Sequence, residues 1–220
     1  MATLEPTDQS VSLIMAEKNH QKEATRERIL NAAESVFSQN GYHDTLMDEV
    51  VEAAGASKGG IYFHFPSKES LFFALMDRLA EKMLREIEEA MLAENEPIRK
   101  VQCALEAALR ALSRQRRLAK ILLLQGYGLG SAFEEKRLDI YGRFALVIQA
   151  ELDQAVAAGA LEKIDTQVTA YAWIGALNEL IVRWIHTGEP DPVKRSLPVL
   201  TQLFLQGVNP ETRVRNKRAK

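Results

Sequence analysis

The stretch of sequence that decides the fold is Thr45–Lys68, which reads TLMDEVVEAAGASKGGIYFHFPSK. Its first half repeats apolar residues at helical spacing, which predicts an amphipathic helix whose apolar face holds Met47, Val50, Val51 and Ala54. Gly55 stands where a left-handed C-cap favours glycine, and Ser57 is suited to cap a second helix that ends near His64. A pair of short helices joined by a tight, glycine-containing turn is a helix-turn-helix motif.

The second helix carries two adjacent glycines, Gly59 and Gly60, although each costs roughly 1 kcal/mol relative to alanine inside a helix. Two explanations are open: tight packing between helices, or close approach of the backbone to a ligand. Thr45 and Asp48 form a capping-box pattern at the start of the first helix, and Ser67 is expected to cap the helix that follows the motif.

In a helix-turn-helix the second helix enters the major groove of DNA, and polar side chains around it bind phosphates and base edges. An earlier helix is predicted from about Thr25 to Asn40, and Thr25 and Arg26 near its start could donate to a phosphate with help from the helix dipole. The other candidate DNA contacts are Thr45, Ser57, Lys58, Gly59, Gly60, Tyr62, His64 and Lys68.

Residues 25–72 resemble the N-terminal DNA-binding domain of the TetR family of transcriptional repressors. The resemblance rests on matches in one fixed order, namely Gly41-Tyr42, Thr45, Ala53-Ala54-Gly55-Ala56-Ser57-Lys58-Gly59, Ile61-Tyr62-Phe63-His64-Phe65 and Ser67-Lys68-Glu69. Two positions depart from the usual pattern. Val50-Val51 replaces Ile-Ala on the same apolar face, and Gly60 stands where the family often has a polar residue or threonine, so one base contact is missing here.

The resemblance implies an all-α fold, with an N-terminal three-helix helix-turn-helix DNA-binding domain and a C-terminal helical ligand-binding and dimerisation domain. It also implies that the last two helices dimerise and that the helix beginning at Ser67 transmits a ligand-induced change. Along the chain we expect a disordered arm over residues 1–20, the DNA-binding domain over 21–66, the effector-binding and dimerisation domain over 67–208, and a basic tail over 209–220.

Composition fits an ordinary globular protein. Of the 220 residues 46% are hydrophobic and 26% are charged, and the formal net charge is −2. The single cysteine, Cys103, excludes an internal disulfide and suits a reducing cytoplasm. We expect no secretory signal and no membrane partner, because no apolar stretch has spanning length. Residues 21–68 hold five Lys or Arg against seven Asp or Glu, so DNA binding should depend only weakly on salt.

After Pro97, which suits the first position of a helix, the sequence stays helical in pattern. The basic run within Arg114–Lys120 is most simply a solvated helix face, with contact to a phosphorylated ligand or to DNA as the alternative. The glycine-rich Gly126–Gly130 follows no strand, which indicates a helix break and argues against a phosphate-binding loop. Ser131 with Glu134 then predicts a capping box.

The most apolar segment, Asp165–Thr187, is apolar nearly all round and must be covered on more than one side. We expect the last two helices to pair with their copies in a two-fold dimer; burial inside one bundle is the alternative. The expected interface residues are Ala172, Gly175, Ala176, Val182, Leu200 and Phe204. The expected effector-pocket residues, for each of which plain core is the simpler explanation, are Leu122, Gln125, Tyr127, Phe144, Trp173, Leu177 and Asn178.

These features predict a ligand-responsive repressor that binds a palindromic operator in double-stranded DNA as a homodimer. A small hydrophobic or amphiphilic effector is expected, and one candidate is a fatty-acyl compound whose phosphates meet the Arg116–Lys120 run. A protein-binding adaptor and a transcriptional activator are alternatives that the sequence leaves open. No enzyme activity, cofactor or metal is expected, since the histidines are scattered and no nucleophile motif or metal-ligand spacing occurs.

Overall fold

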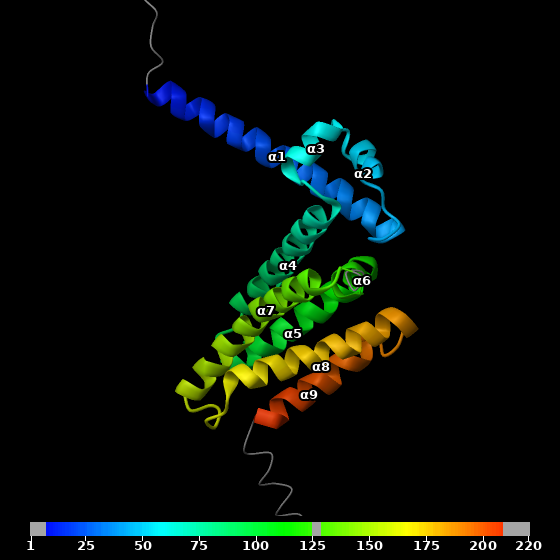
Figure 1. Ribbon diagram of the computed structural model, residues 1–220. Helices are drawn as coiled ribbons and strands as arrows, with labels where there is room; N and C mark the ends of the chain where they lie inside the picture. Colours follow the sequence, from blue (N-terminus) through cyan, green and yellow to red (C-terminus); the bar gives the residue numbers. More distant parts are fainter. Residues whose placement is uncertain (1–7, 125–128, 209–220) are drawn as a thin grey trace, which may run out of the picture. The chain divides into compact units, whose positions relative to one another are not determined.

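The computed structural model describes residues 8–124 and 129–208, and within those ranges it is all-α, as the sequence predicts (Figure 1). Helices form wherever apolar residues recur at helical spacing between glycine, proline and polar caps. In chain order the described elements are α1 (Asp8–Asn40), α2 (Met47–Ala54), α3 (Lys58–His64), α4 (Lys68–Leu92), α5 (Pro97–Arg114), α6 (Arg116–Leu124), α7 (Ser131–Ala157), α8 (Thr166–Thr187), the π-helical segment η1 (Pro192–Ser196) and α9 (Leu197–Val208).

The chain divides into two compact units, one ending at Leu75 and the other beginning at Met76. The boundary that we expected from the sequence lies between residues 66 and 67, so the first turns of α4 pack with the N-terminal unit. The physical reason is aromatic packing at the start of α4. The ring of Phe72 lies 5.6 Å from that of Phe37 and 4.6 Å from that of Tyr42, and Leu71, Phe72 and Leu75 are fully buried.

In the N-terminal unit α2 packs along the C-terminal half of α1, and α3 follows α2 through the turn at Gly55 (Figure 1). The core is formed by one apolar face from each helix, with Ile29, Leu30, Ala33 and Phe37 of α1, Val50 and Ala54 of α2, and Ile61 of α3. Burying these faces is what holds helices as short as α2 and α3, because such short helices are marginal in isolation.

Helix α1 begins at Asp8, so the disordered arm that we expected over residues 1–20 is wrong for residues 8–20. The absence of apolar periodicity in this part of the sequence was nevertheless informative, because residues 17–24 are exposed on every side. Residues 8–24 contain neither glycine nor proline, and they continue a helix that the core nucleates further along. The result is a helical extension whose residues 17–24 are exposed and add nothing to the core of their unit.

Several predicted helix ends are confirmed in the N-terminal unit. Gly55 adopts a left-handed conformation (φ 56°) after α2, and the Ser57 hydroxyl accepts a hydrogen bond from the Gly60 backbone N–H at 3.1 Å. The Ser67 hydroxyl likewise accepts from the Ser70 N–H at 3.0 Å before α4. The turn-and-cap chemistry of the motif is therefore readable directly from the sequence.

The capping box predicted at Thr45 and Asp48 is wrong. The N-cap of α2 is Leu46, and the Glu49 carboxylate accepts a hydrogen bond from the Leu46 N–H at 2.7 Å. Thr45 is fully buried, and its hydroxyl donates to the Gly41 carbonyl at 2.6 Å. Because the threonine side chain is buried and bonded to the Gly41 carbonyl, the N-cap of α2 falls one residue later, at Leu46.

The C-terminal unit is a bundle of α5 to α9 with the rest of α4, in which α7 packs along α8 and α9 packs on α5 (Figure 1). Leu109, Leu152 and Ile181 are fully buried in its main core cluster. The rings of Trp173 on α8 and Phe204 on α9 stack at 4.6 Å with an interplanar angle of 9°. Only one side of α8 is buried in this way, and no other described residue covers its opposite side, where Val168, Tyr171 and Gly175 are exposed.

Predicted starts of helices in this unit are partly confirmed. Pro97 begins α5, and the Asp165 carboxylate accepts from the Val168 N–H before α8. Pro198 marks the change from η1 to α9, as expected of a residue that cannot donate a helical hydrogen bond.

The capping box predicted at Ser131 is wrong, because Gly130 (φ 67°) is the N-cap of α7 and Glu134 pairs with Arg137 at 2.5 Å instead. Of the predicted break at Gly126–Gly130, residues 126–128 lie outside the described residues.

The basic run before Leu122 is not uniformly a solvated face. The Arg116 guanidinium donates to the carbonyl oxygens of Trp184 at 2.8 Å and Ile185 at 2.7 Å, and it lies 5.0 Å from the Trp184 ring centre. These carbonyls belong to the last turn of α8, and that of Trp184 also accepts the C-capping hydrogen bond from the Gly188 N–H at 2.8 Å. Arg116 therefore ties α6 to the end of α8 and is not free to hold an effector phosphate.

Candidate nucleic-acid interface and effector cavity

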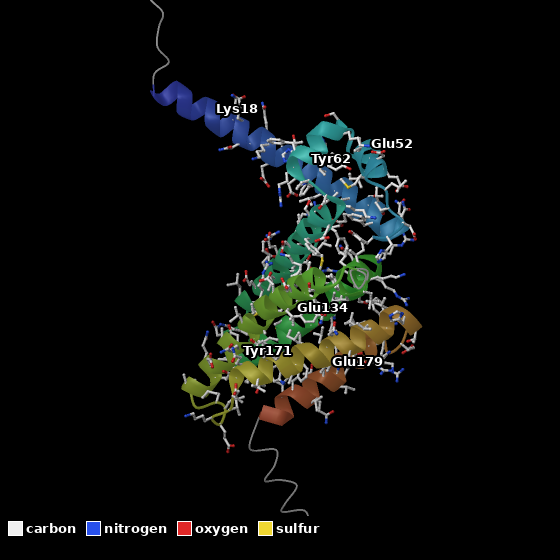
Figure 2. All side chains as sticks on the ribbon, viewed as in Figure 1. Lys18, Glu52, Tyr62, Glu134, Tyr171 and Glu179 are labelled. Carbon is white, nitrogen blue, oxygen red and sulfur yellow. The ribbon has the colours of Figure 1, made fainter. Side chains whose placement is uncertain are left out.

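Helix α3 buries Ile61 and turns its opposite side outward. Lys58, Gly59, Tyr62 and Phe63 are exposed, and Figure 2 shows Tyr62 projecting from this helix. A Cβ atom added at Gly59 would meet nothing within 4 Å, so packing inside the unit does not require a glycine there. Of the two explanations for the paired glycines, close approach to an outside partner is therefore favoured at Gly59.

Lys58 is the cation at the start of this exposed face. Its Nζ lies 2.7 Å from the Asp48 carboxylate of α2, and both side chains are exposed. The hydrogen bond and the charge of Asp48 raise the pKa of Lys58. Since an exposed pair of this kind is weak, a phosphate can replace Asp48 as the partner of the ammonium group.

His64 closes α3 beside two cations of α1. Burial, followed by the positive charges of Lys22 and Arg26, holds the pKa of His64 below its ordinary 6.5. Arg26 itself lies 3.7 Å from Glu23 and 3.8 Å from Glu27, and its guanidinium lies 5.6 Å from the Phe65 ring centre. His64 is accordingly a neutral hydrogen-bonding group at neutral pH until a negative charge approaches it.

Four predicted DNA contacts have other roles in the structure. Thr45 is buried, as described above. The Lys68 ammonium donates to the carbonyl oxygens of Tyr42 (2.9 Å), His43 (3.2 Å) and Thr45 (2.9 Å), which ties the loop before α2 to the start of α4. Thr25 and Arg26 lie far inside α1, because that helix begins at Asp8. The dipole argument for both residues is wrong, and the Thr25 hydroxyl donates to the Gln21 carbonyl at 2.9 Å.

Phe63 is a surface residue that the sequence reasoning did not assign to the DNA-binding site. Its side chain is 73% exposed, between Tyr62 and His64 on α3. The signal was present in the spacing, because an apolar residue two positions after the buried Ile61 falls on the opposite side of a helix. An exposed aromatic ring on a recognition helix can pack against sugars and thymine methyl groups.

The C-terminal unit contains two adjoining apolar cavities among its described residues. The first, here the Tyr141 cavity, has a volume of about 70 Å³, and the second, the Trp173 cavity, has a volume of about 50 Å³. Both are lined by Ala108, Phe144, Ile174 and Leu177, so these four residues form the shared wall. The two cavities lie on either side of this wall, and together they make up an apolar space lined mainly by α4, α5, α7 and α8.

Polar side chains lie only at the Tyr141 end of this space. The Tyr141 hydroxyl donates to Asn178 Oδ1 at 2.5 Å, and the Arg137 guanidinium lies 5.2 Å from the Tyr141 ring centre. The Trp173 cavity is lined by apolar residues alone. The arrangement suits a molecule with an apolar body and a single polar end.

The structure brings four of the seven predicted pocket residues to this space. Phe144, Leu177 and Asn178 line the Tyr141 cavity, and Trp173 lines the other. The Leu122 side chain, Gln125 and Tyr127 lie outside what the structure describes. Arg137 and Tyr141 were missed, although Tyr141 lies one turn before Phe144 on the same apolar stripe of α7.

The predicted dimer surface is only partly exposed. Ala172 and Gly175 are exposed on α8, and Ala176 and Val182 are half-buried. Leu200 and Phe204, with 2% and 5% exposure, pack in the core of their own chain, so assigning them to the interface is wrong. The exposed apolar residues of α9 are instead Val199 (61%) and Leu203 (59%), one position before each.

The described ranges contain neither of two other kinds of site. No group of three His, Cys, Asp or Glu side chains there could hold a metal ion. Nor does any helix in those ranges combine the length and apolar character needed to cross a membrane.

An exposed, glycine-bearing helix set against a supporting helix, in a unit separate from one that encloses an apolar cavity, defines a helix-turn-helix DNA-binding regulator. Residues 29–75 match the family described as "Bacterial regulatory proteins, tetR family". The chain is a transcriptional regulator of the TetR family.

Full-length relatives agree with this assignment. The HTH-type transcriptional regulator YdgC of Bacillus subtilis (strain 168) is 27% identical over 193 residues, which cover 85% of this chain and 94% of that protein. The fatty acid metabolism regulator protein of the same organism is 25% identical over 195 residues, covering 86% and 98%.

Solved structures support the fold. The fatty acid degradation regulator FadR from Bacillus halodurans matches with a TM-score of 0.74 at 20% identity, covering 83% of this chain and 95% of that one. FadR from Bacillus subtilis, in complex with stearoyl-CoA, matches with a TM-score of 0.73 at 20% identity, covering 83% and 99%.

Proposed function

We propose that this protein is a ligand-responsive transcriptional repressor that binds a palindromic operator as a homodimer and is released by a small amphiphilic effector. The observation that carries the proposal is the outward face of α3, where Lys58, Gly59 and Tyr62 are exposed and no packing inside the unit requires the glycine. The repressor acts on chromosomal DNA, which places it in the cytoplasm.

On the operator, α3 enters the major groove and its glycine backbone approaches the DNA closely. Lys58 exchanges Asp48 for a phosphate, and Tyr62 and His64 donate hydrogen bonds to the backbone on either side. Gly60 offers no side chain to a base, so specificity depends on fewer direct contacts. Two copies of α3 related by a two-fold axis read two half-sites one helical turn apart, about 34–36 Å.

The uncovered side of α8 and α9 supports the dimer. Val168, Tyr171, Val199 and Leu203 are large exposed apolar side chains on these two helices. A Cβ atom added at Gly175 would meet nothing within 4 Å, so the chain's own packing does not need a glycine in the middle of α8. A second copy approaching α8 closely accounts for both observations, since it would bury the apolar side chains and require the small residue.

The size of the cavity indicates how an effector couples to DNA binding. An engineered cavity of about 150 Å³ accepts benzene, whereas the two cavities here measure about 70 and 50 Å³. An effector of lipid size must therefore push α4, α5, α7 and α8 apart. Because Met76 and Met83 of α4 line the Tyr141 cavity and the same helix begins in the DNA-binding unit, α4 carries the change.

We assign the effector to the fatty-acyl class, with its chain in the shared apolar space and its polar end beside Arg137, Tyr141 and Asn178. The apolar lining and the single polar end support this class, as does the 25% identity to a fatty acid metabolism regulator over nearly its whole length. The phosphate site expected at Arg116–Lys120 is not part of the proposal, because Arg116 is engaged at the end of α8.

The proposal is tested by gel shift with the DNA upstream of the protein's own gene, in the presence of excess random carrier DNA. We expect a specific complex that palmitate or palmitoyl-CoA dissolves and that coenzyme A alone does not. Ile174→Phe, which fills the wall shared by both cavities, should keep the DNA complex and lose the release. If carrier DNA competes as well as the upstream fragment, the protein is not a specific repressor of its own gene; if neither lipid releases it, the effector class is wrong.

A further inference from the structure

The N-terminal part of α1 carries a basic stripe. Lys18, Lys22 and Arg26 follow one another at intervals of four residues, which places them on one side of the helix. Lys18 and Lys22 are exposed, and Figure 2 shows Lys18 on the part of α1 that extends beyond the helix-turn-helix. Residues 17–24 of α1 are all exposed and contribute nothing to the core of their unit, so burial of apolar side chains does not explain why they are helical.

Two ring contacts show which way the stripe faces. Lys22 Nζ lies 5.6 Å from the ring centre of Phe63, and the Arg26 guanidinium lies 5.6 Å from that of Phe65. Phe63 belongs to the exposed face of α3. The stripe therefore continues the α3 face along α1, and Lys18 lies one turn further out on the same side.

The nearby carboxylates neutralise only one end of the stripe. Glu23 and Glu27 both lie within ion-pair distance of Arg26. None of the ion pairs found in the described part of the chain involves Lys18 or Lys22, and Glu17 lies one position away from Lys18, off the stripe. Among the described residues, the ion pairs thus leave these two exposed ammonium groups beside the DNA-facing helix without an acidic partner.

We infer that this segment of α1 is a second DNA-binding element, in which Lys18 and Lys22 bind phosphates of the duplex flanking each half-site that α3 reads. The inference rests on the proposed function. The two lysines are separated by about 6 Å along the helix, and one strand of B-DNA presents a phosphate about every 3.4 Å of axis. Both ammonium groups can therefore reach the same strand, and the exposed residues 17–24 of α1 acquire a partner of opposite charge.

The test compares wild-type protein with the double variant Lys18→Gln, Lys22→Gln on a duplex selected by the wild-type protein from a randomised library. The selected core is used alone and with one further helical turn, about 10 base pairs, on each side. Fluorescence anisotropy gives the affinity as a function of salt. On the extended duplex, the logarithmic salt slope of the double variant should be smaller by about 2 per protomer, since each phosphate contact contributes about 0.9.

On the trimmed core the two proteins should have the same slope. A matched control, Lys163→Gln with Lys194→Gln, removes two exposed lysines from the C-terminal unit and should leave both slopes unchanged. Equal slopes for wild type and double variant on the extended duplex would overturn the inference. An equal loss on both duplexes would overturn the flanking placement. If the library yields no preferred sequence at all, the proposed function itself fails, which is a different result.

Discussion

Lys58 and Lys68 are both predicted from the sequence to meet phosphates, but only Lys58 projects from the surface. Its ammonium group pairs with the exposed Asp48 carboxylate at 2.7 Å, and DNA can replace this contact. Lys68 directs all three ammonium donors at backbone carbonyls within its own unit. We therefore expect Lys58 to contribute to DNA binding and Lys68 to contribute to the stability of the fold, and a separate experiment tests each role.

The change Asp48→Asn should tighten operator binding several-fold. It removes a negative charge from the DNA-facing surface and frees Lys58 from a competing partner. Lys58→Ala should weaken binding, and in the double variant the benefit of Asp48→Asn should shrink, because the residue that it frees is gone. Anisotropy titrations of the four proteins on one operator fragment check this. An Asp48→Asn protein that binds no better than wild type would show that the pair does not restrain Lys58.

The change Lys68→Met should lower the free energy of unfolding by about 2–3 kcal/mol, because it leaves carbonyls without their charged donor. Thermal or denaturant unfolding measures this, with the exposed Lys82→Met as the control on the same helix. The salt slope of operator binding should stay as in wild type. A fall in the slope by about 1 with unchanged stability would instead restore Lys68 as a phosphate contact.

Operator affinity should rise as the pH is lowered from 8 towards 6. In the free protein the pKa of His64 lies below its ordinary 6.5, owing to burial and then to Lys22 and Arg26. A DNA phosphate near His64 favours the protonated imidazole and raises its pKa in the complex. Binding then takes up a proton at pH values between the two pKa values, so lower pH favours the complex by at most about tenfold per pH unit.

His64→Gln should flatten this pH profile, whereas His43→Gln, which changes an exposed histidine outside α3, should not. A profile that is the same for wild type and His64→Gln would remove His64 from the phosphate contacts.

At the scale of the elements, the adjacent glycines of α3 differ in what they face. Gly59→Ala should stabilise the protein by up to about 1 kcal/mol, since its Cβ meets nothing and alanine is the better helix former. The same change should weaken operator binding, because the methyl group occupies the space into which DNA fits. Circular-dichroism melts and anisotropy measure the two effects. If stability rises and affinity stays unchanged, the backbone of α3 does not approach DNA at Gly59.

Gly60→Ala is the matched comparison, because a Cβ there would lie 3.1 Å from the Ser57 hydroxyl that caps the helix. The gain in stability should be smaller than for Gly59→Ala, or reversed, since the cap must shift.

Helix interiors and glycine turns were predictable from the sequence, whereas several starts of helices were not. Gly55 and Ser57 are local signals, because the backbone angle or the side-chain oxygen acts within a few residues. Thr45 has the sequence context of a capping-box residue, but its side chain is buried. Glu134 has the same kind of context, but its carboxylate pairs with Arg137. The first turns of α1 have no apolar periodicity, so the sequence pattern does not predict a helix there.

At the scale of the whole molecule, the sequence predicts which segments carry the functional surfaces. It predicts less well which individual side chains lie on those surfaces. The recognition helix follows from a compact run of residues, and its exposed side follows from helical spacing. The effector space is lined by residues of six helices, α4 to α9, that run from Met76 to Phe204 in the sequence, so Arg137 and Tyr141 could not be placed without the fold. Similarly, the apolar stripe of α9 is visible in the sequence, but burial alone separates core Leu200 and Phe204 from surface Val199 and Leu203.

Gly175→Leu should convert the protein to a monomer while leaving each chain folded. Within one chain the new side chain meets open space, so the melting temperature measured at low concentration should not fall. In a dimer that packs α8 against its copy, the leucine would hold the two helices apart and expose the apolar side chains of α8 and α9. Sedimentation velocity checks the mass, and Ala24→Leu, a similar enlargement at an exposed position of α1, serves as the control. Because a palindromic operator is bound by both copies of α3 at once, the monomer should also lose most of its operator affinity. An intact Gly175→Leu dimer would mean that the two copies associate through a surface other than this face of α8.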